Sequence, residues 1–210
     1  MVDALVPPAP CILKLGGSLH DAPELGAWLK AVATVRGPPR ILVPGGGPFA
    51  DVVRAAQADM GFADLAAHRM AILAMQQYGL ALQAKEPRLV LAESEAQLRA
   101  VSRGQGAVWL PWLLAGCDDA IEASWEITSD SLALWLACRL RAPLLLLVKS
   151  VRLEVEEIAA KELAAQGVID TAFPRLLPGF GGTVRVLHRS DSGRLAAALG
   201  GIPAGCLLSA

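Results

Sequence analysis

The chain has 210 residues, with 19 Lys and Arg against 20 Asp and Glu, so its formal net charge is only −1. It has no long basic run, which argues against nucleic acid or an anionic membrane surface as its partner. A chain of this length can bury one substantial core. These properties favour a soluble enzyme acting on a small molecule.

Three further features predict a cytoplasmic protein. The first ten residues contain three prolines and lack the apolar core of a signal peptide. The most apolar stretch, residues 132–148, is interrupted by Arg139, Arg141 and Pro143, which argues against a membrane span. The four cysteines are scattered without a C-x-x-C pair, which favours reduced thiols and no metal ligands.

Short apolar runs alternate with helical patterns along the chain. Helices are predicted from apolar spacing and from capping signals, such as the capping box Ser94-Glu95-Ala96-Gln97 that opens a helix ending near Gly104. The expected elements, in chain order, are a strand at 11–15, a helix at 23–35, a strand at 41–43, a helix at 64–82, a strand at 88–92, the capping-box helix, a strand at 107–110, a helix at 132–140 capped by Ser129, a strand at 144–148, a helix at 154–165 and a strand at 183–187. Strands alternating with helices predict an α/β fold, in which helices cover both faces of a mostly parallel sheet.

Two glycine-rich turns directly follow the first two predicted strands. Lys14-Leu15-Gly16-Gly17-Ser18 ends one strand, and Pro44-Gly45-Gly46-Gly47 ends the other. Glycine turns that lead into helices can direct backbone N–H groups and helix N-termini at one anion. Lys14 would add a cation there. The two turns therefore suggest a polyphosphate site and phosphoryl transfer, although glycine turns can also be purely structural.

Two other phosphate motifs fit the chain less well. A Walker A loop is absent, because no glycine run precedes Lys149-Ser150. Gly45, Gly47 and Ala50 match the dinucleotide pattern G-x-G-x-x-A, but the candidate acid Asp64 begins a helical segment with no strand before it. The sequence therefore disfavours a dinucleotide site.

The motifs Lys-x-Gly-Gly-Ser, Gly-Gly-Gly after the second strand, and 128–133 (Thr-Ser-Asp-Ser-Leu-Ala) resemble the amino acid kinase superfamily. Residues 44–51 with Arg54, residues 67–79 and residues 124–130 are more specifically similar to the small kinases of methanofuran biosynthesis. Those kinases phosphorylate aminomethylfuran-methyl phosphate to its diphosphate, a step in making a cofactor of one-carbon metabolism.

The resemblance implies a carbamate kinase-like, three-layer sandwich in a single domain over residues 1–210. It implies an acceptor-binding part at about 1–125, a nucleotide-binding part at about 126–210, and a homo-oligomer. The activity would be that of an ATP-dependent kinase whose acceptor is a small phosphorylated molecule, with Mg²⁺ carried by the nucleotide. The implied site residues are Lys14, Asp130 and Lys149 in catalysis, Gly16, Gly17, Ser18, Gly45, Gly46 and Gly47 on the nucleotide phosphates, and Arg54, His68, Trp125, Thr128 and Ser129 on the acceptor.

Other interpretations stay open. Asp130 can be a first-turn helix acid, Arg54 a solvated charge, and His68 or Trp125 packing residues. One departure from the superfamily matters: Arg152-Leu153 stands where an Asp-Gly pair of the nucleotide loop is expected. A binding or assembly protein with a decayed nucleotide site is therefore one alternative, and a uridylate or isopentenyl phosphate kinase is another.

Overall fold

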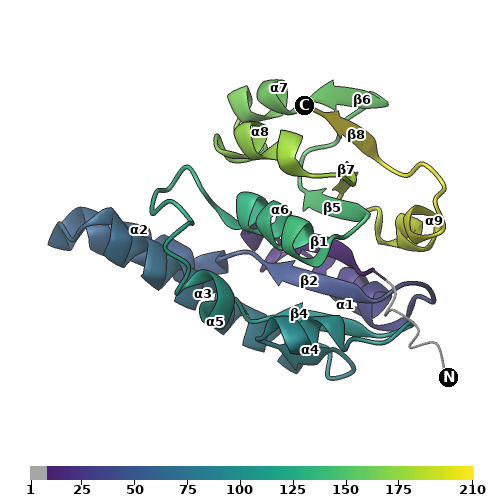
Figure 1. The fold of residues 1–210 in the computed structure, drawn as a ribbon, viewed down its shortest axis with the longest axis horizontal. Coiled ribbons are helices and arrows are strands. Elements are labelled where there is room, and N and C mark those ends of the chain that lie inside the picture. Colours follow the sequence, from purple (N-terminus) through teal and green to yellow (C-terminus); the bar gives the residue numbers. More distant parts are fainter. Residues whose placement is uncertain (1–8) are drawn as a thin grey trace, which may run out of the picture.

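The computed structural model describes residues 9–210, and a single sheet runs through them (Figure 1). The strands lie in the order β3-β4-β2-β1-β5-β7-β8-β6. Their bounds are β1 (Cys11–Leu15), β2 (Arg40–Pro44), β3 (Val90–Ala92), β4 (Gly106–Trp109), β5 (Leu144–Lys149), β6 (Glu157–Ala159), β7 (Thr183–His188) and β8 (Cys206–Ser209). Neighbouring strands pair in parallel, except β7 and β8, which are antiparallel.

Helices separate these strands along the chain. They are α1 (Leu25–Thr34), α2 (Gly47–Met60), α3 (Asp64–Lys85), α4 (Glu95–Arg99), α5 (Trp112–Ala115), α6 (Ser129–Leu140), α7 (Ala160–Ala165), α8 (Phe173–Leu176) and α9 (Leu195–Leu199), with short 3₁₀ turns η1 (Gly17–Leu19), η2 (Leu177–Gly179) and η3 (Ser192–Arg194). None of the helices in residues 9–210 is both long and apolar enough to cross a membrane.

The central strands are buried on both faces, as expected for a parallel sheet between two helical layers. Ile12 of β1 belongs to an apolar cluster that includes Leu136 of α6. The next residue, Leu13, points to the opposite face and belongs to a second cluster that includes Trp28 of α1. These two clusters confirm the predicted three-layer α/β sandwich.

The predicted strands are all present, with ends that differ by at most two residues. The structure adds two strands that the sequence pattern did not reveal, β6 and β8. The prediction of a helix over 154–165 was wrong in its first half, because 157–159 form β6 against β8 and the helix begins only at Ala160. A three-residue strand that begins with an exposed glutamate has too little apolar pattern to be recognised.

Two helix starts also differ from the sequence prediction. Helix α6 begins at Ser129, and its N-cap is Thr128, whose hydroxyl accepts a hydrogen bond from the Asp130 N–H. The first glycine turn leads only into the 3₁₀ turn η1, since α1 begins at Leu25. Only the second turn therefore opens directly into an α-helix. The capping box at Ser94 is confirmed, although its helix ends at Arg99, well before Gly104.

Candidate active site

The fold brings two lysines to the same edge of the sheet. Strands β1 and β5 are parallel neighbours, with Lys14 in register with Leu147. Lys14 is the penultimate residue of β1 and Lys149 is the last residue of β5. The carboxyl ends of adjacent parallel strands are where α/β proteins place their ligands. Both cations are therefore positioned to face one ligand.

Asp130, in the first turn of α6, joins these two lysines. Its Oδ1 lies 3.0 Å from Lys14 Nζ, and its Oδ2 lies 2.6 Å from Lys149 Nζ. The Asp130 side chain is only 5% exposed. The structure thus brings the three residues predicted to be catalytic into one buried contact, which carries a net charge of +1 when both lysines are protonated.

Burial and the neighbouring charges act in opposite directions on these groups. Burial disfavours the Asp130 carboxylate, but Lys14 and Lys149 outweigh it and hold its pKa below the usual value. Burial, together with the charge of Lys14, lowers the pKa of Lys149 to about 8, although Asp130 partly offsets this. Lys149 therefore loses its positive charge much closer to neutral pH than an ordinary lysine does.

The two glycine turns pack directly against each other beside this contact. A Cβ at Gly45 would lie 2.3 Å from the Gly17 nitrogen, and a Cβ at Gly17 would lie 2.6 Å from the Gly47 nitrogen. Gly47 also has a positive φ of 55°. Any larger residue at Gly17 or Gly45 would force the turns apart. Close approach of the two backbones therefore explains these glycines.

The turns differ in what they can offer an anion. The N–H of Gly45 donates a hydrogen bond to the Leu15 carbonyl at 3.0 Å, so it is not free for the predicted donation to a phosphate. Gly46 is the N-cap residue of α2, and the first N–H groups of a helix have no carbonyl acceptor within the helix. Ser18 lies exposed in η1. The N-terminus of α2 is thus the better anion-binding element.

Asp170 is a buried residue that the sequence analysis missed. Its carboxylate accepts hydrogen bonds from the N–H and hydroxyl of Thr128 (both 2.9 Å), from the N–H and hydroxyl of Ser131, and from the Phe173 N–H. It therefore fixes the N-terminus of α6, and with it Asp130, to the segment that precedes α8. The available signal was an acid that directly follows the apolar pair Val168-Ile169.

A small cavity of about 40 Å³ lies next to Gly46, between α2, α3 and the segment before α6. Of the predicted acceptor residues, it brings together His68, Trp125, Thr128 and Ser129. Its remaining lining is apolar, as with Ala50, Ile72, Met75 and Leu132. The cavity suits a compact group that is apolar apart from the part that faces His68.

His68 lines this cavity with a hydrogen-bonding atom that the fold does not use. Its Nε2 is buried and has no hydrogen-bond partner. Burial, reinforced by the charge of Arg69, lowers the pKa of His68 below 6.5. The imidazole is therefore neutral at pH 7, and it can accept or donate one hydrogen bond to a bound molecule.

Arg54 is the predicted acceptor residue that the structure leaves outside the cavity lining. It pairs with Asp51 at 3.1 Å, and its guanidinium lies 4.4 Å from the centre of the Trp125 ring. The Trp125 Nε1–H in turn donates to Gln57 Oε1 at 2.6 Å. Arg54 thus influences the cavity through Trp125, whose ring it and Gln57 hold in place.

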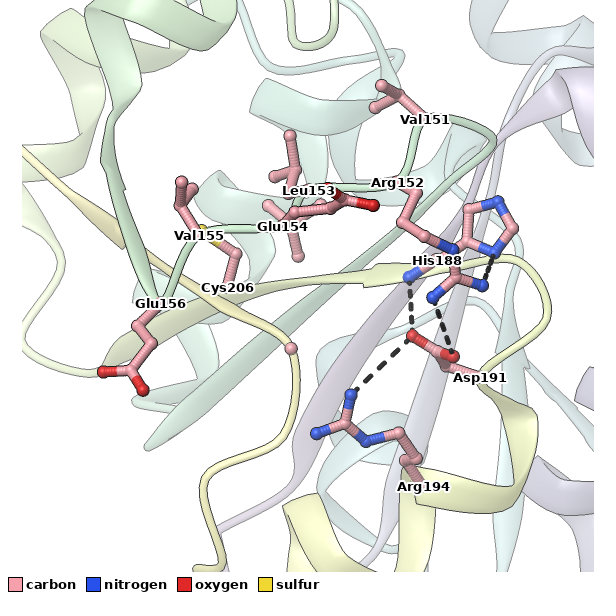
Figure 2. Close-up of a pocket in the computed structure, with 12 residues that line it drawn as sticks. Val151, Arg152, Leu153, Glu154, Val155, Glu156, His188, Asp191, Arg194 and Cys206 are labelled. Carbon is pink, nitrogen blue, oxygen red and sulfur yellow. Dashed lines mark hydrogen bonds and ion pairs between the residues drawn. The ribbon is translucent and has the colours of Figure 1, made fainter.

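A second, larger cavity of about 230 Å³ opens beyond Lys149, between the segment after β5 and the loop after β7 (Figure 2). His188 lies in register with Lys149 on the neighbouring strand. Arg152 reaches across the cavity wall to His188 Nδ1 at 2.9 Å and Ser190 Oγ at 2.7 Å, and it lies 3.9 Å from Asp191. Arg152 and Leu153 stand where the Asp-Gly pair is expected. The side chain of Arg152 is held by His188, Ser190 and Asp191, and it lines an open cavity.

The glycine turns, the helix N-terminus and the lysine pair define a class of protein, the α/β proteins that bind phosphate at the carboxyl edge of a parallel sheet. Residues 9–152 match the family model of the amino acid kinase family, and the chain belongs to that family.

One curated relative and several solved structures resemble the chain. It is 34% identical over 127 residues to the [5-(aminomethyl)furan-3-yl]methyl phosphate kinase of Methanocaldococcus jannaschii, a match that spans 60% of this chain and 58% of that enzyme. In fold it resembles uridylate kinase from Archaeoglobus fulgidus (TM-score 0.67, 16% identity, 95% of this chain and 99% of the other). It also resembles UMP kinase from Bacillus anthracis (TM-score 0.66, 14% identity, 97% and 96%).

Proposed function

We propose that the protein is an ATP-dependent kinase that phosphorylates a small phosphomonoester. The observation that carries this proposal is the buried contact of Lys14, Asp130 and Lys149 beside the glycine turns. Transfer of a γ-phosphoryl group is chiefly a matter of positioning and of stabilising charge on the transferred oxygens. Two lysines held by one carboxylate, next to the N-terminus of α2, supply both requirements.

The proposed acceptor is [5-(aminomethyl)furan-3-yl]methyl phosphate, which would become its diphosphate in the synthesis of a methanofuran-type cofactor. The support is the 34% identity to the kinase of that name and the small apolar cavity that contains His68 and Trp125. A neutral His68 could accept a hydrogen bond from the aminomethyl group, and Trp125 would lie beside the furan ring. The side chains around the cavity would have to move apart to admit the furan ring, because a cavity of about 40 Å³ holds little more than one water molecule.

In the proposed reaction, a terminal oxygen of the acceptor phosphate attacks the γ-phosphorus of ATP. A new P–O bond forms, the bond from the γ-phosphorus to the β–γ bridging oxygen breaks, and its electrons leave with ADP. An acceptor phosphate with a second pKa near 6 is already a dianion at pH 7, so no general base is needed. Lys14 and Lys149 would balance the charge on the transferred group.

Mg²⁺ would be carried by the nucleotide and would neutralise its phosphates. Within residues 9–210, no three side chains among His, Cys, Asp and Glu gather as a metal site. Asp130 is already occupied by two lysines. The nucleoside is proposed to lie in the cavity of Figure 2, where Arg152 and Arg194 line the wall.

The deciding experiment offers the purified protein Mg-ATP together with [5-(aminomethyl)furan-3-yl]methyl phosphate, UMP or isopentenyl phosphate in parallel reactions, with ADP release measured. We expect turnover of the furan compound to exceed the others by at least tenfold in kcat/KM. Preferential use of UMP or isopentenyl phosphate would refute the acceptor but leave the kinase standing. Calorimetric titration that finds no nucleotide binding would favour the alternative, a binding or assembly protein with a decayed nucleotide site.

A further inference from the structure

Tyr78, on the inner face of α3, has a buried hydroxyl that the fold does not use. The residue is only 5% exposed. Its hydroxyl oxygen is buried and has no hydrogen-bond partner among residues 9–210. A buried hydroxyl without a partner lowers stability, because it gives up its hydrogen bonds to water and gains none in return. Phenylalanine would fill the same space without that loss, so core packing does not explain the hydroxyl.

The ring of Tyr78 packs against the second glycine turn. A Cβ on Gly47 would lie 3.2 Å from both Cγ and Cδ2 of the ring, and Gly47 is the first residue of α2. Gly47 in turn touches the first glycine turn, since a Cβ on Gly17 would lie 2.6 Å from the Gly47 nitrogen. The ring therefore limits how far the second turn can move away from the first.

The surroundings of Tyr78 also connect it to the first glycine turn. Tyr78 belongs to the apolar cluster that contains Leu15 and Leu19, the two leucines that flank that turn. Burial raises the pKa of Tyr78 to about 12, and the charge of Asp21, two residues after η1, adds to this rise. The Asp21 carboxylate is 77% exposed and lies 3.8 Å from His20 Nδ1. Acceptors for the hydroxyl are therefore present in the segment 17–21, as backbone carbonyls and as this carboxylate.

The first glycine turn is the more adaptable of the two. It leads into η1, which is held by two backbone hydrogen bonds, from Leu19 to Gly16 and from His20 to Gly17. Hydrogen bonds of a short 3₁₀ turn have poorer geometry than those of an α-helix. The second turn, in contrast, opens the 14-residue helix α2 and is backed by the Tyr78 ring. A phosphate bound between the turns would therefore draw the segment 17–21 toward α2 rather than the reverse.

We propose that Tyr78 is a positioning residue for the phosphate site. Its ring fixes the second glycine turn, and its hydroxyl donates a hydrogen bond to the segment 17–21 once phosphate is bound. This role depends on the proposed binding of the nucleotide phosphates between the turns, and Tyr78 acts through the turns and not by contact with the phosphate. The hydroxyl then lowers the stability of the free protein and raises the affinity for the nucleotide.

Tyr78→Phe removes the hydroxyl, keeps the ring and so tests these two opposite effects. The free variant should unfold at a temperature at least about 2 °C higher than the wild type, because the unpartnered hydroxyl is gone. Its dissociation constant for Mg-AMPPNP, an ATP analogue that resists γ-phosphoryl transfer, should rise at least about tenfold, because the new hydrogen bond cannot form. Scanning calorimetry measures the first quantity and isothermal titration the second.

Two further variants separate the hydroxyl from the ring and from general effects. Tyr78→Leu also removes the ring, so it should lose both stability and affinity. Thr34→Val removes an exposed hydroxyl at the far end of α1, which donates to the Lys30 carbonyl, and it is the control that should keep the wild-type affinity.

Tyr78 is the single tyrosine of the chain, so tyrosine labelled with ¹³C at Cζ gives one NMR signal. The chemical shift of this carbon responds to hydrogen bonding of the phenol oxygen. We expect the signal to move when Mg-AMPPNP is added. A signal that stays in place while the analogue binds would overturn the role of the hydroxyl.

The affinity and stability measurements can each contradict the proposal. A Tyr78→Phe variant that binds Mg-AMPPNP as tightly as the wild type, or one that is less stable when free, would show that the hydroxyl does not act on the bound state as proposed. Both outcomes leave the nucleotide site standing. A wild-type protein that fails to bind Mg-AMPPNP would instead refute the nucleotide site, and with it the role of Tyr78.

Discussion

Asp130 lies between two lysines, so removing the aspartate and removing a lysine leave different net charges in the contact. Each oxygen of the carboxylate faces a different lysine, at 3.0 Å for Lys14 and 2.6 Å for Lys149. Removing the aspartate would leave two buried cations close together, and removing one lysine would still leave a neutral pair. Single substitutions at these three positions therefore test different parts of the proposed chemistry.

Lys14→Ala should reduce kcat by at least about 100-fold while it weakens ATP binding by less than about tenfold. The physical reason is that the charge of Lys14 matters most when negative charge develops on the transferred oxygens. Steady-state kinetics give the first quantity and calorimetric titration gives the second. Equal losses in both would show that Lys14 is only a ground-state anchor for the nucleotide.

Lys149 should impose a decline of kcat/KM for ATP above about pH 8. Its pKa in the folded protein is lowered to about 8, so it loses its positive charge as the pH rises through that value. A pH–rate profile measures the decline. Lys149→Arg keeps its charge to much higher pH. If that variant retains activity, its alkaline decline should move upward by more than one pH unit, and an unchanged decline would assign it to another group.

The same pKa shift has a consequence for stability. The unfolded lysine titrates near 10.5, so between about pH 8 and 10.5 the unfolded chain binds more protons than the folded one. The contribution of this group to the free energy of unfolding therefore rises with pH across that window. Burial of Lys149 as a cation is favourable for the proposed function and unfavourable for folding.

At the scale of elements, the N-terminus of α6 depends on Asp170. Five hydrogen bonds converge on one carboxylate, from Thr128, Ser131 and Phe173. Four of them hold the first turn of α6, which carries Asp130. We therefore expect Asp170 to be a positioning residue, one that would act on the proposed phosphate site through the helix and not by contact with a substrate.

Asp170→Asn should destabilise the protein by about 2 kcal/mol, because hydrogen bonds to a buried charge are lost and the amide brings N–H groups without acceptors. Urea denaturation measures this loss. We also expect kcat to fall by more than tenfold with KM for ATP changed little, since Asp130 shifts while the glycine turns remain. Glu122→Gln, in the exposed pair with Arg175, is the control and should cost less than about 1 kcal/mol. A destabilised variant with normal kcat would show that Asp170 is structural only.

At the scale of the whole molecule, the proposed acceptor part and the proposed nucleotide part share one sheet. Strand β1 pairs along its full length with β2 on one side and with β5 on the other. The apolar cluster that contains Ile12 also includes residues from α3 and α8, which lie far apart in sequence. The two parts proposed from the family resemblance are therefore expected to unfold together as a single domain.

Differential scanning calorimetry should accordingly show one transition, with equal calorimetric and van't Hoff enthalpies per unfolding unit. Mg-ATP at about 100 times its dissociation constant should stabilise the folded state by about 2.7 kcal/mol and raise the whole transition. A second transition that ATP leaves in place would divide the chain into two domains.

Much of the fold followed from local patterns in the sequence. Apolar runs between turn signals predicted the strands of the sheet core because such strands are buried on both faces and read as continuous apolar segments. The glycine-rich motifs indicated where β1 and β2 end and the turns begin, and the capping box at Ser94 predicted the start of α4. The strands β6 and β8 were missed because their pairing is decided by contact between distant segments, and a three-residue strand has no period of its own.

For the site, the sequence by itself determined the residue types, and the family resemblance predicted roles for Lys14, Asp130, Lys149 and the glycine turns. Only the tertiary structure decided which of them meet. It showed that Asp130 contacts both lysines, that the Gly45 N–H is already used within the fold, that Arg54 lies outside the cavity of His68, and that Asp170 supports α6 from 40 residues away. The reason is physical: side-chain chemistry is a local property of the chain, whereas distance, burial and the resulting pKa values depend on which strands become neighbours.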